Sequence, residues 1–154
     1  MRVISRSALT RSVSGKRILV DSNIIIYLTD SIVPYEKLSR HLFEIIEKGD
    51  AFACFSSISV AEVMQGPIKT NKAKIALELK DYLLNFPNSI CQDIDKVVLD
   101  RIGGDNRVNW SRLRTTDSLI IASGLVNTVD RIVSNDRHFR TAISGDFVIS
   151  FDLT

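Results

Sequence analysis

Short apolar runs of strand type alternate with segments of helical periodicity along almost the whole chain. Such alternation predicts a parallel sheet with helices on both faces, because parallel strands are joined by crossover helices. A chain of 154 residues suits one domain of this kind. We expect strands at residues 18–20, 51–55, 90–91, 131–134 and 147–151, and helices at residues 23–28, 35–48, 59–65, 71–84, 94–102, 116–127 and 136–144.

Local signals predict where two of these helices begin and end. The segment 35–48 has apolar residues at helical spacing and is followed by Gly49, a residue that commonly ends a helix. Ser59 and Glu62 have the spacing of a capping box, which would start the next helix. Gly66-Pro67 would then end that helix, since proline cannot donate the backbone hydrogen bond that a helix interior needs.

Four acidic residues stand at corresponding places in this pattern. Asp21 and Asp136 each stand at or just past the end of a predicted strand. Glu62 and Asp117 each stand in the first turn of a predicted helix. Ligands of parallel α/β folds bind beyond the carboxyl ends of the strands, near the switch in strand order. All four acids can therefore point into one rim.

Each acid also has a structural explanation when it is considered alone. Asp21 is a common type of turn residue after a strand, and Glu62 fits the third position of the capping box. Asp117 complements the dipole of its helix, and Asp136 can cap the helix that follows it. For any one of them the structural role is favoured, and only the combination favours a functional site.

Four carboxylates that lie close together need protons or a cation to offset their repulsion. Two unit charges about 5 Å apart repel by roughly 3 kcal/mol at an effective dielectric constant near 20. Four carboxylates on one rim therefore take up protons or attract a cation, and none of the four motifs contains a lysine. A nearby arginine remains an alternative. Ligands that are all oxygen suit Mg²⁺ or Mn²⁺, which retain several waters and support phosphoryl transfer.

Composition excludes several other classes. The chain has two histidines, too few for a His-rich zinc site, and two cysteines, which do not make a disulfide framework. Its longest apolar stretches are too short to span a bilayer, so we expect no membrane segment and a cytoplasmic location.

The formal charge of +2 conceals an uneven distribution. Residues 1–17 contain no acidic residue, whereas the rest of the chain has 15 basic and 18 acidic residues. We expect this segment to be a flexible basic leader. A transit peptide, an over-long start and an arm that contacts RNA are the alternatives. Its basic residues are Arg2, Arg6, Arg11, Lys16 and Arg17.

Four segments, in this order, resemble the successive motifs of PIN-domain nucleases. They are ILVDSNIIIYL, SISVAEVMQG, LRTTDSLIIASGL and RIVSNDRHF. The resemblance runs from about residue 18 to the C-terminus and is strongest to the small VapC-type toxins of toxin–antitoxin pairs. It implies an α/β/α sandwich with a central parallel sheet of about five strands, formed by residues 18–154.

The resemblance also implies a site and a reaction. The acidic positions of the family correspond to Asp21, Glu62, Asp117 and Asp136, which would be the catalytic and metal-binding residues. Asn23 and Ser134 correspond to polar residues that support them. The implied activity is that of a Mg²⁺- or Mn²⁺-dependent endoribonuclease that is blocked by a cognate antitoxin.

The RNA contacts are predicted from charge and stacking. Arg114, Arg137 and Trp110 could meet phosphates and a base, and Arg107, Arg112 and Arg140 are further candidates. The alternative is that these arginines are solvated surface charges and that the tryptophan fills a gap in the packing.

Two alternatives to a toxin nuclease remain, and a third is disfavoured. The chain could be a catalytically silent PIN-like binding or regulatory module, or an RNA-processing nuclease outside a toxin pair. A haloacid-dehalogenase-type phosphatase would need a second aspartate two residues after Asp21, where the chain has Asn23. Helices 35–48 and 71–84 could bind an antitoxin helix or form a homodimer face, although such helices more often only cover a core.

Overall fold

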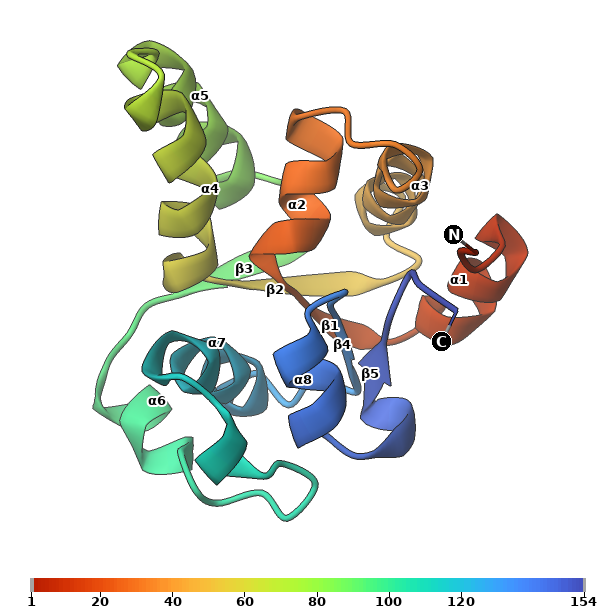
Figure 1. The fold of residues 1–154 in the computed structure, drawn as a ribbon, viewed down its shortest axis with the longest axis vertical. Helices are drawn as coiled ribbons and strands as arrows, with labels where there is room; N and C mark the ends of the chain where they lie inside the picture. Colours follow the sequence, from red (N-terminus) through yellow and green to blue (C-terminus); the bar gives the residue numbers. More distant parts are fainter. Residues whose placement is uncertain (1, 154) are drawn as a thin grey trace.

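The structure, a computed structural model, describes residues 2–153 and is built around a five-stranded sheet (Figure 1). All strand pairs are parallel, and the order across the sheet is β3-β2-β1-β4-β5. The predicted strands are thereby confirmed, with shifts of one or a few residues at their ends. Their bounds are β1 (Arg17–Val20), β2 (Phe52–Ser56), β3 (Ser89–Gln92), β4 (Arg131–Val133) and β5 (Val148–Ile149).

Helices cover both faces of the sheet, as the alternation predicted. Figure 1 shows α2 to α5 on one side of the sheet, α6, α7 and α8 on the other, and α1 beside the β5 edge. No helix within the described residues is long and apolar enough to cross a membrane. The helices are α1 (Arg6–Val13), α2 (Ser22–Thr29), α3 (Glu36–Glu47), α4 (Ser57–Lys69), α5 (Ala73–Leu84), α6 (Lys96–Arg101), α7 (Thr115–Val126) and α8 (Arg137–Ala142), with short 3-10 turns η1 (Trp110–Arg112) and η2 (Gly145–Phe147).

Successive residues of a strand place their side chains in two separate apolar cores, one on each face of the sheet. In β1, Ile18 and Val20 join the apolar cluster under α2, α3 and α4, whereas Leu19 joins the cluster under α7 and α8. In β2, Phe55 belongs to the first cluster and Cys54 to the second. This alternation follows from the two-residue period of a strand, and it explains why the strands are continuously apolar. The fold is therefore the three-layer α/β/α sandwich that the sequence predicted.

The order of the strands determines where the site lies. The chain passes from β1 outward to β2 and β3, and then returns to place β4 on the other side of β1. The switch point is therefore between β1 and β4, whose residues Val20 and Val133 are paired. Both strands point the same way, so the residues that follow them, Asp21 and Ser134, emerge side by side.

Helix α7 packs on the sheet at a glycine that leaves no room for a side chain. A Cβ atom at Gly124 would lie 3.0 Å from Leu19 Cδ2 and 3.1 Å from Val129 Cγ2. A larger residue would push α7 away from β1, and with it the N-terminal turn of α7 that contains Asp117. Gly124 therefore helps to set the distance between one of the predicted acids and the sheet.

The sequence analysis expected a flexible leader at residues 1–17, but its described part, residues 2–17, is folded onto the domain. Arg6–Val13 forms α1, with Ser5 as its N-cap, and Arg17 already belongs to β1. Leu9 and Val13 are fully buried in the cluster under α3. The Ile4 N–H also donates to the Phe151 carbonyl at 2.8 Å. Two apolar side chains four residues apart thus dock a short helix onto the domain despite the basic residues around them.

Helix α4 begins earlier and ends later than the sequence analysis expected. Its N-cap is Ser56, whose Oγ accepts a hydrogen bond from the Ile58 N–H at 3.2 Å, so the capping box of Ser59 and Glu62 does not form. The helix also continues past Gly66 and contains Pro67 near its end. A proline there removes one hydrogen bond only, and its carbonyl accepts from Lys72 N in the turn to α5.

Candidate active site

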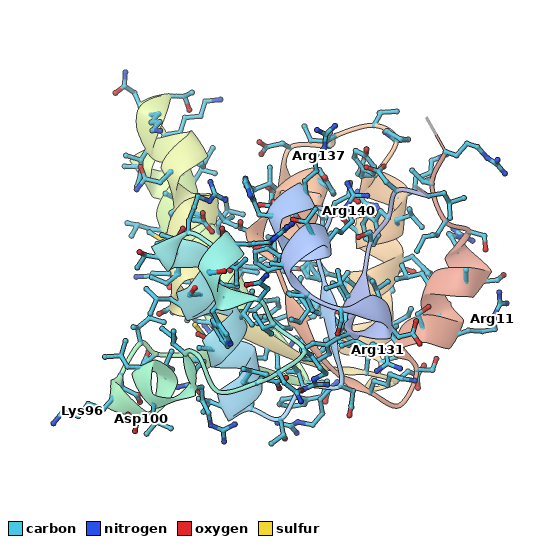
Figure 2. All side chains as sticks on the ribbon, turned by 60° about the horizontal axis from the view of Figure 1, so that its bottom comes forward. Arg11, Lys96, Asp100, Arg131, Arg137 and Arg140 are labelled. Carbon is cyan, nitrogen blue, oxygen red and sulfur yellow. The ribbon has the colours of Figure 1, made fainter. Side chains whose placement is uncertain are left out.

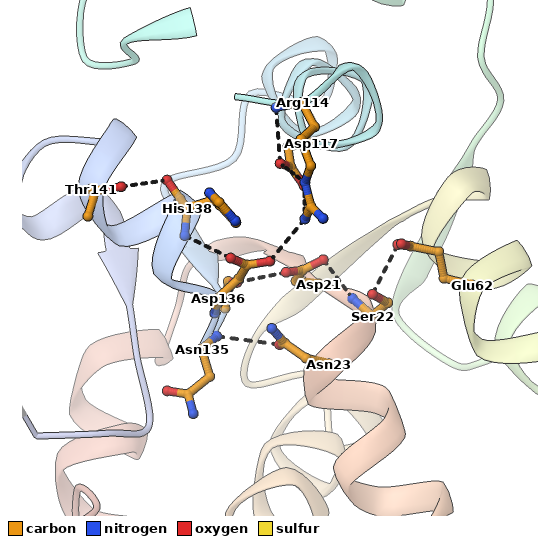
Figure 3. Close-up of polar contacts among 11 residues, drawn as sticks. Asp21, Ser22, Asn23, Glu62, Arg114, Asp117, Asn135, Asp136, His138 and Thr141 are labelled. Atoms are coloured by element: carbon orange, nitrogen blue, oxygen red, sulfur yellow. Dashed lines mark hydrogen bonds and ion pairs between the residues drawn. The ribbon is translucent and has the colours of Figure 1, made fainter. Parts of the chain in front are cut away.

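The four acids lie around one rim at the carboxyl ends of β1 and β4 (Figure 3). Asp21 is the N-cap of α2, Asp136 is the N-cap of α8, and Asp117 lies in the first turn of α7. Glu62 lies further along, in the second turn of α4. The elements that carry them come from both helical layers, so only the folded chain brings these acids together.

Asp21 is buried, with 3% of the residue exposed, the same fraction as for Asp117. Its Oδ1 accepts from the Ser22 N–H at 2.8 Å, and its Oδ2 accepts from the Ser134 hydroxyl at 2.7 Å. Burial raises its pKa from 3.8 to about 6, the two hydrogen bonds oppose this shift, and the charges of Glu62 and Asp136 add to it. The protein therefore holds a carboxylate where an additional positive charge would be favourable.

Ser134 joins two of the acids. Its hydroxyl donates to Asp21 and accepts from the Asp136 N–H at 3.1 Å, and the residue is fully buried. The Asp136 Oδ1 in turn accepts from the His138 N–H at 2.7 Å, which is the helix-capping bond foreseen as its structural role. Ser134, which was predicted to support the acids, thus links Asp21 to the loop between β4 and α8 through these two hydrogen bonds.

Asp117 is also buried, and it has a cationic partner. Its Oδ2 accepts from Arg114 Nε at 2.9 Å and from the Arg114 backbone N–H at 3.2 Å, and its Oδ1 accepts from Arg114 Nη2 at 3.1 Å. The same Nη2 lies 3.5 Å from Asp136 Oδ2. These acids raise the pKa of Arg114, chiefly through the hydrogen bond with Asp117, so the guanidinium stays charged.

A nearby arginine was one of the cations that the sequence left open, but Arg114 was predicted as an RNA contact and was not named for this role. The signal was present, because Arg114 stands three residues before Asp117 and the two belong to the same helical turn. The contact with Asp136 had no local signal, since 22 positions separate the two residues in the sequence.

Glu62 reaches the rim through a serine that sequence reasoning also missed. Its Oε1 accepts from the Ser22 hydroxyl at 3.0 Å, and the glutamate is otherwise exposed on α4. Ser22 follows Asp21 directly, so one two-residue segment contacts Glu62 on one side and Ser134 on the other.

A second layer of polar contacts holds the loop after β4. Asn23 Oδ1 accepts from the Asn135 N–H at 3.4 Å, a long bond. The Asn135 amide donates to the Tyr27 hydroxyl and to Asp152 Oδ2, both at 3.1 Å, and its Oδ1 accepts from the Asp152 N–H at 3.0 Å. The Tyr35 hydroxyl donates to Asp152 Oδ1 at 2.7 Å. Asn23, which was expected near the N-cap, is the second residue of α2. Through Asn135 it belongs to the polar contacts that hold the loop after β4.

The candidate RNA contacts differ in their surroundings. Arg137 is exposed at the start of α8, directly after Asp136, and Figure 2 shows it with Arg140 on that helix, away from the α6 residues Lys96 and Asp100. Trp110 is half-buried in η1 and contacts the apolar cluster under α7. The packing role foreseen as the alternative for Trp110 is thus realised in part.

The donor chemistry of the rim fits a hard divalent cation. All four acids carry carboxylate oxygens, and the hydrogen bonds described for Asp21 come from uncharged donors. Within residues 2–153, however, no three acidic, histidine or cysteine side chains are close enough to form a complete metal cage as they stand. Magnesium and manganese need only a few carboxylates with water, and part of the acidic set is engaged by Arg114.

The sequence matches the PIN domain family over residues 18–143. The chain therefore belongs to the PIN domain family, and the resemblance noted in the motifs is confirmed. Comparison with curated proteins gives no match. The matched span begins at β1, so α1 lies outside it.

Solved structures of VapC-type proteins share the fold. They include VapBC2 from Rickettsia felis, bound to a promoter DNA fragment, with 17% identity and a TM-score of 0.65 over 88% of this chain and 99% of that chain. DNA-bound VapBC from Salmonella typhimurium has 18% identity and a TM-score of 0.62 over 88% and 98%. VapC20 from Mycobacterium tuberculosis, a sarcin-ricin loop cleaving toxin, has 10% identity and a TM-score of 0.60 over 82% and 96%.

Proposed function

We propose that the protein is a divalent-metal-dependent endoribonuclease and the toxin of a toxin–antitoxin pair in the cytoplasm. The observation that carries the proposal is the buried Asp21 at the switch point, facing Asp136 and Glu62 across one rim. Membership of the PIN domain family and the likeness to VapC structures, one of them a toxin that cleaves the sarcin-ricin loop, support RNA as the substrate.

In this proposal Asp21, Asp117 and Asp136 hold Mg²⁺ or Mn²⁺, and Glu62 acts through Ser22 or a bound water. The ion, when bound, lowers the pKa of a water and stabilises the charge that develops on the phosphodiester. The chain itself fixes geometry: Ser22 and Ser134 orient the Asp21 carboxylate from two sides. The Asp136 carboxylate is held by the His138 N–H at the start of α8. Arg114 and Arg137 stand beside these acids, where they can pair with RNA phosphates.

An antitoxin is the proposed partner. The VapBC structures that share this fold are complexes, which supports a cognate antitoxin here. Helix α5 offers a surface for it, because Ile75 and Tyr82, which are seven residues apart and lie on one face of this helix, are exposed. The second face named from the sequence, that of α3, is less suitable, because its apolar residues are buried in the core. A homodimer through α5 is the alternative, and the molecular mass in solution separates the two.

The direct test is cleavage of total RNA with Mg²⁺, with Mn²⁺ and with a chelator. We expect discrete cleavage products with either ion and none with the chelator, and mapping of the new ends gives the site. The Asp21→Asn variant, purified in parallel, controls for contaminating nucleases. Cleavage that persists in the chelator would contradict metal dependence. An absence of cleavage on every RNA would favour the silent binding module, and cleavage without toxicity in the host would favour an RNA-processing nuclease.

The affinity for Mn²⁺ should depend on pH. Because the pKa of Asp21 is raised to about 6, the carboxyl carries a proton below that pH, and the proton must leave before a cation binds. We expect the affinity to be constant above about pH 7 and to fall by up to about tenfold per pH unit below pH 6. Calorimetric titration with Mn²⁺ at pH 5, 6, 7 and 8 measures this, and an affinity that does not change between pH 5 and 8 would contradict competition between a proton and the cation at Asp21.

A further inference from the structure

Arg114 connects two acids that come from different elements. Its guanidinium forms two hydrogen bonds with Asp117 on α7 and lies 3.5 Å from Asp136 in the loop after β4 (Figure 3). One side chain thus closes the gap between the two parts of the rim. A divalent cation that used both carboxylates would have to lie in the same gap.

The two partners in this ion pair differ greatly in exposure. The Asp117 side chain is 4% exposed, whereas the Arg114 side chain is 62% exposed. The acid is fixed in the first turn of α7, and the arginine backbone N–H would still donate to it if the guanidinium left. The guanidinium is therefore the exchangeable half of the pair, since its long stem can move into solvent at little cost.

A buried carboxylate is costly without a positive charge beside it. Arg114 supplies that charge as the structure stands. Because a guanidinium and a divalent cation repel each other at contact distance, the two cannot share the same oxygens of Asp117 and Asp136. Occupancy of this end of the rim by one excludes the other.

We infer that Arg114 is a resident cation that holds the Asp117–Asp136 end of the site and is displaced when a divalent cation binds, so that this arginine lowers the metal affinity of the site. The inference rests on the proposed metal-dependent function and adds a residue that controls how the site is loaded. Displacement also frees the guanidinium for the RNA phosphate contact proposed above.

Titration of the full chain with Mn²⁺ alone, followed by calorimetry at pH 8, tests this exchange. We expect Arg114→Met, which keeps the apolar stem, to bind Mn²⁺ about tenfold or more tightly than the wild type. Arg114→Lys should be intermediate, because it keeps the charge and loses the fork of donors. Arg112→Met is the matched control, since it removes the same charge from an exposed residue two positions away and should change the affinity by less than about twofold.

Thermal unfolding gives a readout that does not depend on activity. In chelator, Arg114→Met should melt at a lower temperature than the wild type, because Asp117 loses its cation. Saturating Mn²⁺ should raise the melting temperature of this variant more than that of the wild type.

The outcomes separate the inference from the proposed function. Unchanged or weaker Mn²⁺ binding in Arg114→Met would overturn the exchange and leave the metal-dependent nuclease intact. A lack of Mn²⁺ binding in the wild type and in every variant would overturn both.

Discussion

Asp21→Asn is expected to reduce metal-dependent RNA cleavage by more than about 100-fold while leaving the domain folded. Even the loss of a residue that only orients a metal ligand costs about 10–100-fold, and Asp21 is proposed as a ligand itself. Asparagine has the same shape, and its Oδ1 can still accept from Ser22 N. The measurement is the rate of cleavage of a defined RNA at saturating Mn²⁺.

The same substitution should stabilise the metal-free protein. The pKa of Asp21 is raised from 3.8 to about 6, so protonation of this carboxyl favours the folded state. The stabilisation from protonation is fully present below about pH 4 and is lost as the pH rises through 6. A shift of about two pKa units corresponds to about 3 kcal/mol, so at pH 8 in chelator the asparagine variant should be more stable by about 1–3 kcal/mol.

Denaturant unfolding at pH 8 and at pH 5 checks this result. The advantage of Asp21→Asn should shrink at pH 5, where the wild-type carboxyl is mostly protonated. Asp146→Asn on η2 is a suitable control, because this acid lies outside the rim. Wild-type cleavage by Asp21→Asn, or a variant that is less stable than the wild type at pH 8, would contradict the assigned environment of Asp21.

Leu9→Ala is expected to destabilise the domain by about 2–5 kcal/mol, the usual cost of removing a buried leucine side chain. Leu9 is fully buried, and it lies in the same apolar cluster as Ile18 in β1 and Phe151 near the C-terminus. For a domain of this size the melting temperature should fall by at least about 4 °C. Thermal and denaturant unfolding of the full chain give the measurement.

Arg11→Ala on the same helix is the matched control. Arg11 is exposed, so its replacement should change the stability by less than about 0.5 kcal/mol. Equal stability of Leu9→Ala and the wild type would show that α1 contributes nothing to the core, and the first 17 residues would then behave as the flexible leader that their charge predicted.

Much of the fold could be predicted because its signals are local. The apolar run before Asp21 and the run before Ser134 have the length and composition of buried parallel strands, and both become neighbouring strands of the sheet. The helix over residues 35–48 was placed within a residue at each end, because Gly49 adopts the left-handed conformation that ends it. Where two local signals competed, as at Ser56 and Ser59, the spacing of the capping box misplaced the start of α4.

The sequence by itself determined the alternation of strands and helices, the family, and the placing of Asp21 and Asp136 at strand ends. These follow from periodicity and from which residue comes next along the chain. Only the tertiary structure decided that Ser22 contacts Glu62, that α1 is part of the core, and that Arg114 bridges Asp117 and Asp136. Such contacts depend on how far each helix stands from the sheet, which is fixed by packing such as that of Gly124 on Leu19. The local pattern of the sequence does not determine the distance between a helix and the sheet.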